Sequence, residues 1–192
     1  HNLGEVIDGC IAYIDNKDIT IEELSKFVKG PDFPTGGIIK GKSGILSAFK
    51  TGRGSIVIES KVSIEEKSVD KKKSIVITEI PYAINKSKLV EKIAGVTKDK
   101  IVEDISDIRD ESNRQGVRIV VEIKKGGNPD IVLANLYKHT PLRTSFGVNA
   151  LALKDGTSPE VMDLKKMISI FVSFREEVTR KRILFELSKA RE

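Results

Sequence analysis

Phosphate binding is the first chemistry that this chain of 192 residues suggests, because residues 36–43 read GGIIKGKS. The stretch fits the nucleotide-binding pattern G-x-x-x-x-G-K-[ST], in which a buried strand delivers a glycine-rich turn to a helix N-terminus and the lysine reaches the outer phosphates. The preceding residues, PDFPT, cannot form that strand, and Ile38 and Ile39 are themselves typical of a strand. We therefore interpret the match as a basic turn that fits the pattern by chance. An independent nucleotide hydrolase is the alternative, which nucleotide binding to the chain would reveal.

The basic residues around this motif are the candidates for contact with another anion. Residues 36–54 carry four basic side chains and no acidic one, namely Lys40, Lys42, Lys50 and Arg53. The formal net charge of +5 at pH 7 permits nucleic acid as a partner. Aromatic residues make up 5% of the chain and tryptophan is absent, which argues against stacking on single-stranded bases. We expect these four side chains to contact the phosphates of duplex DNA, with a solvated basic surface as the alternative.

Three other sets of potentially reactive residues are better explained by structural roles than by chemistry. The segment EDISDIRDES gathers five carboxylates, but it lacks the spacing of a calcium loop, and Arg109 and Arg114 are close enough in the sequence to neutralise it. His139 is the only internal histidine, so no nucleophile–histidine grouping is evident. The single cysteine, Cys10, lies among apolar residues at helical spacing and is typical of a core side chain. The sequence predicts no catalytic residue, metal site or cofactor site within this chain.

Capping residues and apolar periodicity predict the elements that position these residues. We expect helices at 2–16, 20–28, 43–50, 85–96, 128–137 and 163–192. Alternating apolar residues predict strands at 55–66, 74–80, 105–109, 117–124 and 145–153, the first two joined by the lysine-rich turn KSVDKKK. From residue 74 the order is β-α-β-β-α-β, the split β-α-β arrangement of ferredoxin-like sandwiches. The predicted fold class is α+β, a two-layer sandwich with a mainly antiparallel sheet and a long C-terminal helix.

The apolar runs and the two ends of the chain indicate whether it crosses a membrane and whether it is a piece of a longer protein. The longest apolar run, 167–172, is far shorter than the roughly 20 residues that cross a bilayer, so we expect no membrane partner. The chain begins with His1, and its last helical pattern has no closing glycine or proline. We therefore expect a piece of a longer protein.

Six segments in order resemble the A subunits of bacterial type IIA topoisomerases, those of DNA gyrase above all. They read HNLGEVIDGCIAYIDN, GPDFPTGGIIKGKSGILSAFKTGRGSI, ITEIPYAINKSKLVEKIA, ISDIRDESNRQGVRIVVEIK, NLYKHTPLRTSFGVNALAL and FREEVTRKRILFELSKARE. The resemblance spans essentially the whole chain. The A subunit of topoisomerase IV, a decatenating enzyme, is the alternative within the same family.

The resemblance implies a role in an ATP-dependent isomerase. In that family the A subunit cleaves both strands of a duplex by tyrosine attack, passes a second duplex through the gap and reseals it, which in gyrase gives negative supercoiling. The nucleophile directly follows an arginine in a winged-helix domain, whereas Tyr13, Tyr82 and Tyr137 follow Ala, Pro and Leu. The catalytic tyrosine is thus expected outside this chain, which alone should be inactive. Magnesium and ATP are expected in the partner B subunit.

The resemblance also implies a domain plan and partners. Residues 1–30 would be helices joining from the winged-helix domain, 31–162 a tower-like α+β domain, and 163–192 the start of the coiled-coil helix. This region would support and bend the gate duplex through backbone contacts and link it to the dimer gate, with a purely structural spacer as the alternative. The implied partners are duplex DNA, the gyrase B subunit and a second A subunit in an A2B2 complex, in a cytoplasmic, nucleoid-associated location.

Overall fold

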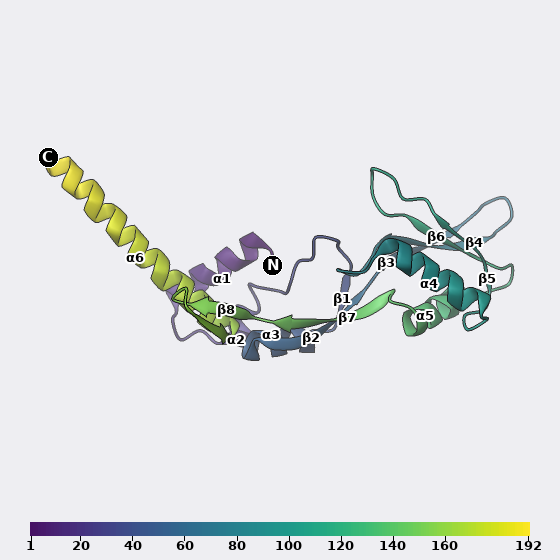
Figure 1. Cartoon of the computed structure of the whole chain (residues 1–192), viewed down its shortest axis with the longest axis horizontal. Coiled ribbons are helices and arrows are strands. Elements are labelled where there is room, and N and C mark those ends of the chain that lie inside the picture. Colours follow the sequence, from purple (N-terminus) through teal and green to yellow (C-terminus); the bar gives the residue numbers. More distant parts are fainter. The chain divides into compact units, whose positions relative to one another are not determined.

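The computed structural model describes residues 1–192, in which helices are interspersed with the strands of antiparallel sheets (Figure 1). The chain divides into two units. The helical unit comprises 1–32, 42–55 and 147–192, and the sheet unit comprises 33–41 and 56–146. The α+β class, the antiparallel sheets and the long C-terminal helix are confirmed. The domain boundaries at 31 and 163 stay predictions.

The sheet unit is built on four antiparallel strands in the order β3-β4-β6-β5. Their bounds are β3 Lys61–Glu66, β4 Lys73–Glu79, β5 Ile105–Asp110 and β6 Ile119–Ile123. Helices α4 (Lys86–Lys98) and α5 (Pro129–His139) begin at the predicted caps, since Asn85 accepts a hydrogen bond from the Lys88 N–H and Asn128 from the Asp130 N–H. Apolar residues of the two helices and of one sheet face form the core, including Ile75, Ile77, Leu89, Ile93, Val121 and Leu136.

The predicted split β-α-β unit is present, with one change at the edge of the sheet. Strand β6 lies between β4 and β5, as the ferredoxin-like pattern requires, but β3 pairs with the other side of β4. Strand β7 (Arg143–Asn149), which we expected at that edge, belongs instead to a three-stranded sheet with β1 (Ile38–Lys40) and β2 (Arg53–Glu59). The hairpin of β3 and β4 thus occupies the place of the fourth strand.

Two strands predicted as continuous are each divided by one residue. The expected strand 55–66 breaks at Ser60, whose N–H and hydroxyl both donate to the Leu142 carbonyl, at 2.9 and 3.0 Å. The expected strand 145–153 breaks at Ala150, whose N–H donates to the Gly52 carbonyl and whose own carbonyl accepts from the Met162 N–H. In each case hydrogen bonds to a segment far away in the sequence interrupt the strand. The alternation of apolar residues along the chain does not predict such an interruption.

The helical unit contains α1 (Leu3–Asp15), α2 (Ile21–Leu24), α3 (Ser43–Thr51) and α6 (Leu164–Arg191), with a hairpin of β8 (Leu151–Lys154) and β9 (Ser158–Val161). Thr20 and Glu23 form the predicted capping box, although α2 ends at Leu24 and not at residue 28. Cys10 is buried beside Leu24 and Ile168, and burial raises the pKa of its thiol. Its predicted role as a core side chain is confirmed.

No helix of the chain combines the length and the apolar character that a membrane span requires.

Candidate nucleic-acid interface

The glycine turn at the start of GGIIKGKS already holds an anion, the carboxylate of Glu79. The Gly37 N–H donates to Glu79 Oε2 at 2.7 Å. A Cβ placed on Gly36, where φ is +72°, would lie 2.4 Å from the same carboxylate. The backbone N–H that a phosphate loop would direct at a nucleotide therefore binds the chain's own side chain.

The remainder of the motif also departs from a phosphate loop. Ile38, Ile39 and Lys40 form β1, which pairs antiparallel with β2, so these residues are a strand as predicted. The helix that follows begins at Ser43, and its preceding residue Lys42 makes no side-chain capping hydrogen bond. A phosphate loop runs from a strand through glycines directly into a helix. Here a strand separates the glycine pair from the helix.

Helix α3 and its two ends carry three of the four predicted basic residues. Lys42 precedes the helix, Lys50 lies in its last turn and Arg53 follows the left-handed Gly52 that ends it. A Cβ on Gly52 would lie 2.6 Å from the Met162 carbonyl oxygen, so only glycine fits this turn. The fourth residue, Lys40, belongs to the sheet unit. The structure thus places Lys42, Lys50 and Arg53 within α3 or directly beside its ends.

The backbone of Arg53 is held firmly. Its carbonyl accepts hydrogen bonds from the hydroxyls of Thr51 and Ser47, at 2.8 and 3.1 Å, and its N–H donates to the Thr51 hydroxyl at 3.1 Å. The Arg53 side chain is exposed. Because these hydrogen bonds fix the backbone of Arg53, its exposed guanidinium extends from a defined point of the chain.

The four basic residues differ in whether a carboxylate already neutralises them. Lys50 Nζ lies 2.5 Å from Glu22 Oε1, and this contact lowers the pKa of Glu22. Lys40 Nζ lies 3.7 Å from the buried Glu59 carboxylate, which also accepts from Arg143 Nε at 2.8 Å. Lys42 and Arg53 take part in neither pair and are exposed. They are the two predicted residues whose charge stays open to a partner.

Two lysines that the sequence did not single out lie beside Lys42. Lys26 and Lys29 line a hollow of about 450 Å³ together with Lys42, Ser25, Ile45 and Leu46. The two lysines follow α2 and are separated from Lys42 by more than ten residues. No sequence signal could have joined them, because only the packing of the segment after α2 beside α3 brings them together.

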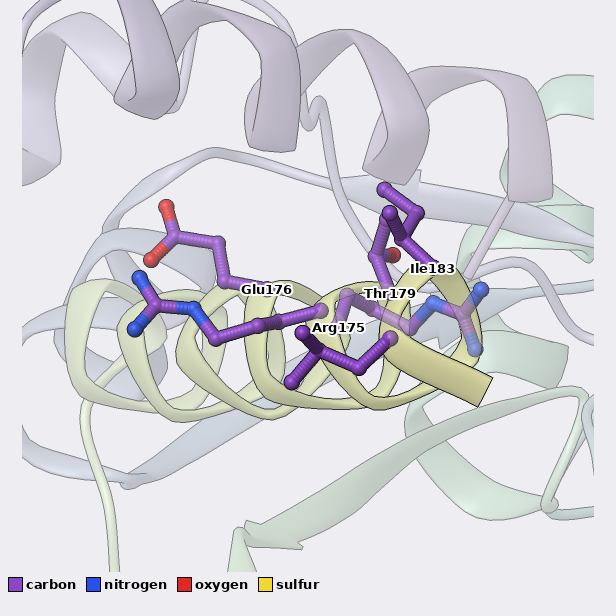
Figure 2. Close-up of a pocket in the computed structure, with 6 residues that line it drawn as sticks. Arg175, Glu176, Thr179 and Ile183 are labelled. Carbon is purple, nitrogen blue, oxygen red and sulfur yellow. The ribbon is translucent and has the colours of Figure 1, made fainter. Parts of the chain in front are cut away.

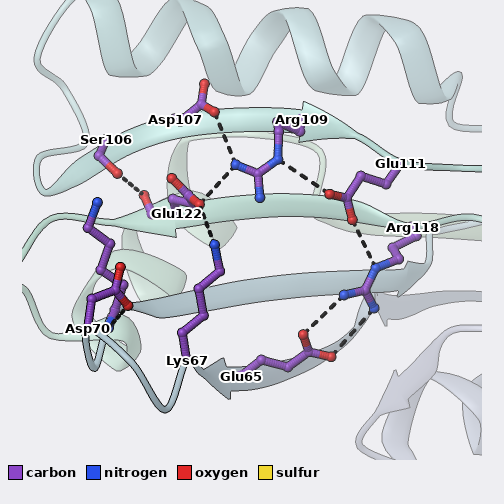
Figure 3. Close-up of polar contacts among 10 residues, drawn as sticks. Glu65, Lys67, Asp70, Ser106, Asp107, Arg109, Glu111, Arg118 and Glu122 are labelled. Atoms are coloured by element: carbon purple, nitrogen blue, oxygen red, sulfur yellow. Dashed lines mark hydrogen bonds and ion pairs between the residues drawn. The ribbon is translucent and has the colours of Figure 1, made fainter.

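Two carboxylates of EDISDIRDES, Asp107 and Glu111, belong to a salt-bridge network around Arg109 and Arg118 (Figure 3), and a third, Asp110, pairs with Lys86. Arg109 pairs with Asp107, Glu111 and Glu122, which confirms it as a neutralising residue. The second neutralising residue is Arg118 and not Arg114: it lies 3.0 Å from Glu65 and 3.1 Å from Glu111. Hydrogen bonding to Arg109 lowers the pKa of Glu122, and hydrogen bonding to Arg118 lowers that of Glu111.

A second hollow, of about 510 Å³, follows the exposed part of α6 (Figure 2). Its lining consists of Arg175, Glu176, Thr179, Arg180, Ile183 and Leu184. All six residues belong to one stretch of a single helix, so the hollow has one wall and cannot enclose a substrate. It is the flank of a helix whose apolar residues Ile183 and Leu184 are exposed.

Comparison with known proteins gives a family and similar relatives. The family model that describes the A subunit of DNA gyrase and topoisomerase IV matches residues 1–192. Relatives named as DNA gyrase A subunits include those of Rickettsia conorii (56% identical over 192 residues), Clostridium acetobutylicum (55% over 190) and Pseudomonas aeruginosa (49% over 193). These alignments cover 99–100% of this chain and 21–23% of each relative.

The chain therefore spans about a fifth of the length of the curated relatives it matches. The family resemblance of the six segments is therefore supported by a match along the full chain. The chain belongs to the family of DNA gyrase and topoisomerase IV A subunits.

Proposed function

We propose that this chain is the part of a type IIA topoisomerase A subunit that supports the cleaved duplex, in the tower-like position with the start of the coiled-coil helix. Residues 31–162 would form the tower-like domain, 1–30 the connection to the winged-helix domain, and 163–192 the helix toward the dimer gate. The holoenzyme would be gyrase, an A2B2 complex that introduces negative supercoils, with topoisomerase IV as the alternative. Its location would be cytoplasmic and nucleoid-associated.

The observation that carries this proposal is the exposed, unneutralised pair Lys42 and Arg53 at the two ends of α3. Cations that lack a carboxylate partner keep their full attraction for phosphate oxygens. Lys40 and Lys50 would contribute less, because Glu59 and Glu22 already offset their charges. Such contacts fix the position of a duplex without reading its sequence.

These contacts would help to hold the gate duplex in a bent form. Bending a site of 20–30 base pairs costs about 1–6 kcal/mol, which additional phosphate contacts along the bend can offset. The cleavage chemistry would be performed by a tyrosine outside this chain, and ATP and magnesium would act in the partner B subunit. The chain alone would therefore bind a duplex without cleaving it.

Duplex binding across a salt series tests the proposal directly. We expect log K to fall linearly with log salt, and the change Lys42→Gln with Arg53→Gln to reduce that slope by about 0.9 for each phosphate that is no longer bound. The matched control is Lys88→Gln with Lys92→Gln, two exposed lysines of α4 in the sheet unit. A wild-type chain without a salt slope, or equal slopes for the test and control variants, would refute the role of α3.

A structural spacer is the second candidate, and it is favoured by the internal pairing of Lys40 and Lys50 and by the 28 residues of α6. A spacer would carry the helix to the dimer gate and would touch DNA little. In the full-length enzyme with its B subunits, Lys42→Gln with Arg53→Gln separates the two functions. Loss of supercoiling with intact assembly contradicts the spacer, and unchanged supercoiling supports it.

A further inference from the structure

We propose that Lys26, Lys29 and Lys42 converge on a single phosphate group of the duplex backbone, held in the hollow beside α3. This inference rests on the proposed function and deepens it. It adds Lys26 and Lys29 to the DNA-contacting residues, and it assigns three cations to one phosphate.

Folding brings the three lysines to the same hollow. Lys26 and Lys29 follow the last turn of α2, and Lys42 immediately precedes α3. All three line the same hollow of about 450 Å³, and all three side chains are exposed. Each ammonium can therefore reach into one solvated space without unfolding any element.

The lining of the hollow contains three cations and no carboxylate. The acidic residue of α2 that pairs with a lysine is Glu22, and its partner is Lys50. Glu5 lies near Lys29, but its carboxylate accepts the Lys29 backbone N–H, at 3.1 Å. Three like charges around one space repel one another, and a bound anion relieves that repulsion.

The remaining residues that line the hollow favour a phosphate group alone over a nucleotide whose base would also be bound. Ser25, Ile45 and Leu46 complete the wall, and Ile45 is buried. No aromatic side chain lines the hollow for stacking on a base, and no amide side chain is present to pair with a base edge. Lysine ammoniums act as compact point charges with rotatable donors, which suits a phosphate whose base lies elsewhere.

The test compares three variants of the whole 192-residue chain on one duplex across a salt series. They are Lys26→Gln with Lys29→Gln, Lys42→Gln alone, and the triple change. If the three lysines share one phosphate, the double variant and the Lys42→Gln variant each bind more weakly with nearly the wild-type slope, because the remaining lysines still hold the phosphate. The triple variant then loses about 0.9 in slope, the value for one phosphate.

Two outcomes overturn the inference while leaving the proposed function intact. Slope losses of about 1.8 for the double variant and 2.7 for the triple variant would mean three separate phosphates. Unchanged affinity of the double variant, with the slope still reduced by Lys42→Gln and Arg53→Gln, would mean that Lys26 and Lys29 do not contact DNA. A wild-type chain with no salt slope would instead overturn the proposed function together with this inference.

A second arm distinguishes a duplex phosphate from a free one. Amide chemical shifts of Lys26, Lys29 and Lys42 are followed during titration with the duplex and, separately, with inorganic phosphate. We expect the duplex to move these signals at concentrations where inorganic phosphate does not. Movement with inorganic phosphate alone, and none with the duplex, would assign the site to a free anion and overturn the inference.

Discussion

Two groups of cations, one in each unit, are arranged in opposite ways. In the sheet unit, Arg109 and Arg118 are each shared between carboxylates, so that the charges of these two arginines are neutralised within the unit (Figure 3). In the helical unit, Lys42 and Arg53 take no part in the ion pairs that neutralise Lys40 and Lys50. Charge density alone therefore does not mark a binding surface, because paired cations such as Arg109 and Arg118 contribute little net charge to a partner.

The network of the sheet unit covers apolar residues. Cross-strand partners place Val76 and Val120 on the same sheet face as Glu122, opposite the face that contributes Ile75 and Val121 to the core. Both valines are nearly inaccessible, at 0% and 4% exposure. Arg109 lies directly opposite Val120 in the strand pairing, so its aliphatic stem can shield the valine while its guanidinium binds carboxylates. Arg109 is thus placed to contribute to packing as well as to neutralise carboxylates.

We expect the largest effect from a change at Glu59, because it is the least exposed of the carboxylates that form ion pairs. Its side chain is 8% exposed and serves both Arg143 and Lys40. Arg143 in turn lies over the Tyr137 ring, 4.6 Å from its centroid. We expect Glu59→Ala to lower the free energy of unfolding by about 2 kcal/mol, below the 3–5 kcal/mol of a fully buried pair because both cations reach water.

Urea denaturation of the chain measures this change. The control is Glu65→Ala, which removes one exposed partner of Arg118 and should shift the midpoint far less. Equal midpoint shifts for the two variants would mean that burial does not distinguish the pairs. In that case the internal pairing of Lys40 would be no reason to discount it as a DNA contact.

Glu22 allows the opposite change, in which a neutralised cation is released. Glu22→Gln removes the carboxylate 2.5 Å from Lys50 Nζ on the same unit as Lys42 and Arg53. If pairing is what keeps Lys50 from DNA, the salt slope of duplex binding should steepen by up to about 0.9. Glu23 is not a suitable control position because its side chain is part of the capping box, so the control is Asp18→Asn, an exposed acidic residue before α2. A slope that responds equally to both changes would reflect net charge alone.

The local elements could be predicted from the sequence, because caps act over three residues. Asn2, Asn85, Asn128 and Asp163 each accept the expected backbone hydrogen bond at a helix start. The strand breaks at Ser60 and Ala150 could not be predicted, since their hydrogen-bond partners lie 82 and 98 residues away in the sequence at Leu142 and Gly52. These contacts depend on the finished fold.

The same limit applies to the candidate site. The basic character of residues 40–53 was visible in the sequence, but the partners of Lys40 and Lys50 were not. Glu59 and Glu22 lie outside the stretch without acidic residues, and only the pairing of β1 with β2 and the packing of α2 near α3 bring them to the lysines. Lys26 and Lys29 were missed for the same reason.

The smallest effect that we expect is a pH dependence confined to the sheet unit. Hydrogen bonds to Arg109 and Arg118 lower the pKa of Glu122 and Glu111 below their ordinary values. Between the lowered folded pKa and the ordinary glutamate pKa of about 4.3, the unfolded chain then binds more protons than the folded chain. This stability is therefore present above the ordinary pKa and is lost as pH falls through the folded pKa. Urea midpoints at pH 6 and pH 3.5 should differ less for Glu111→Gln with Glu122→Gln than for wild type. The exposed carboxylate Glu103, outside the network, supplies the control Glu103→Gln, and an equal flattening there would assign the effect to general charge repulsion.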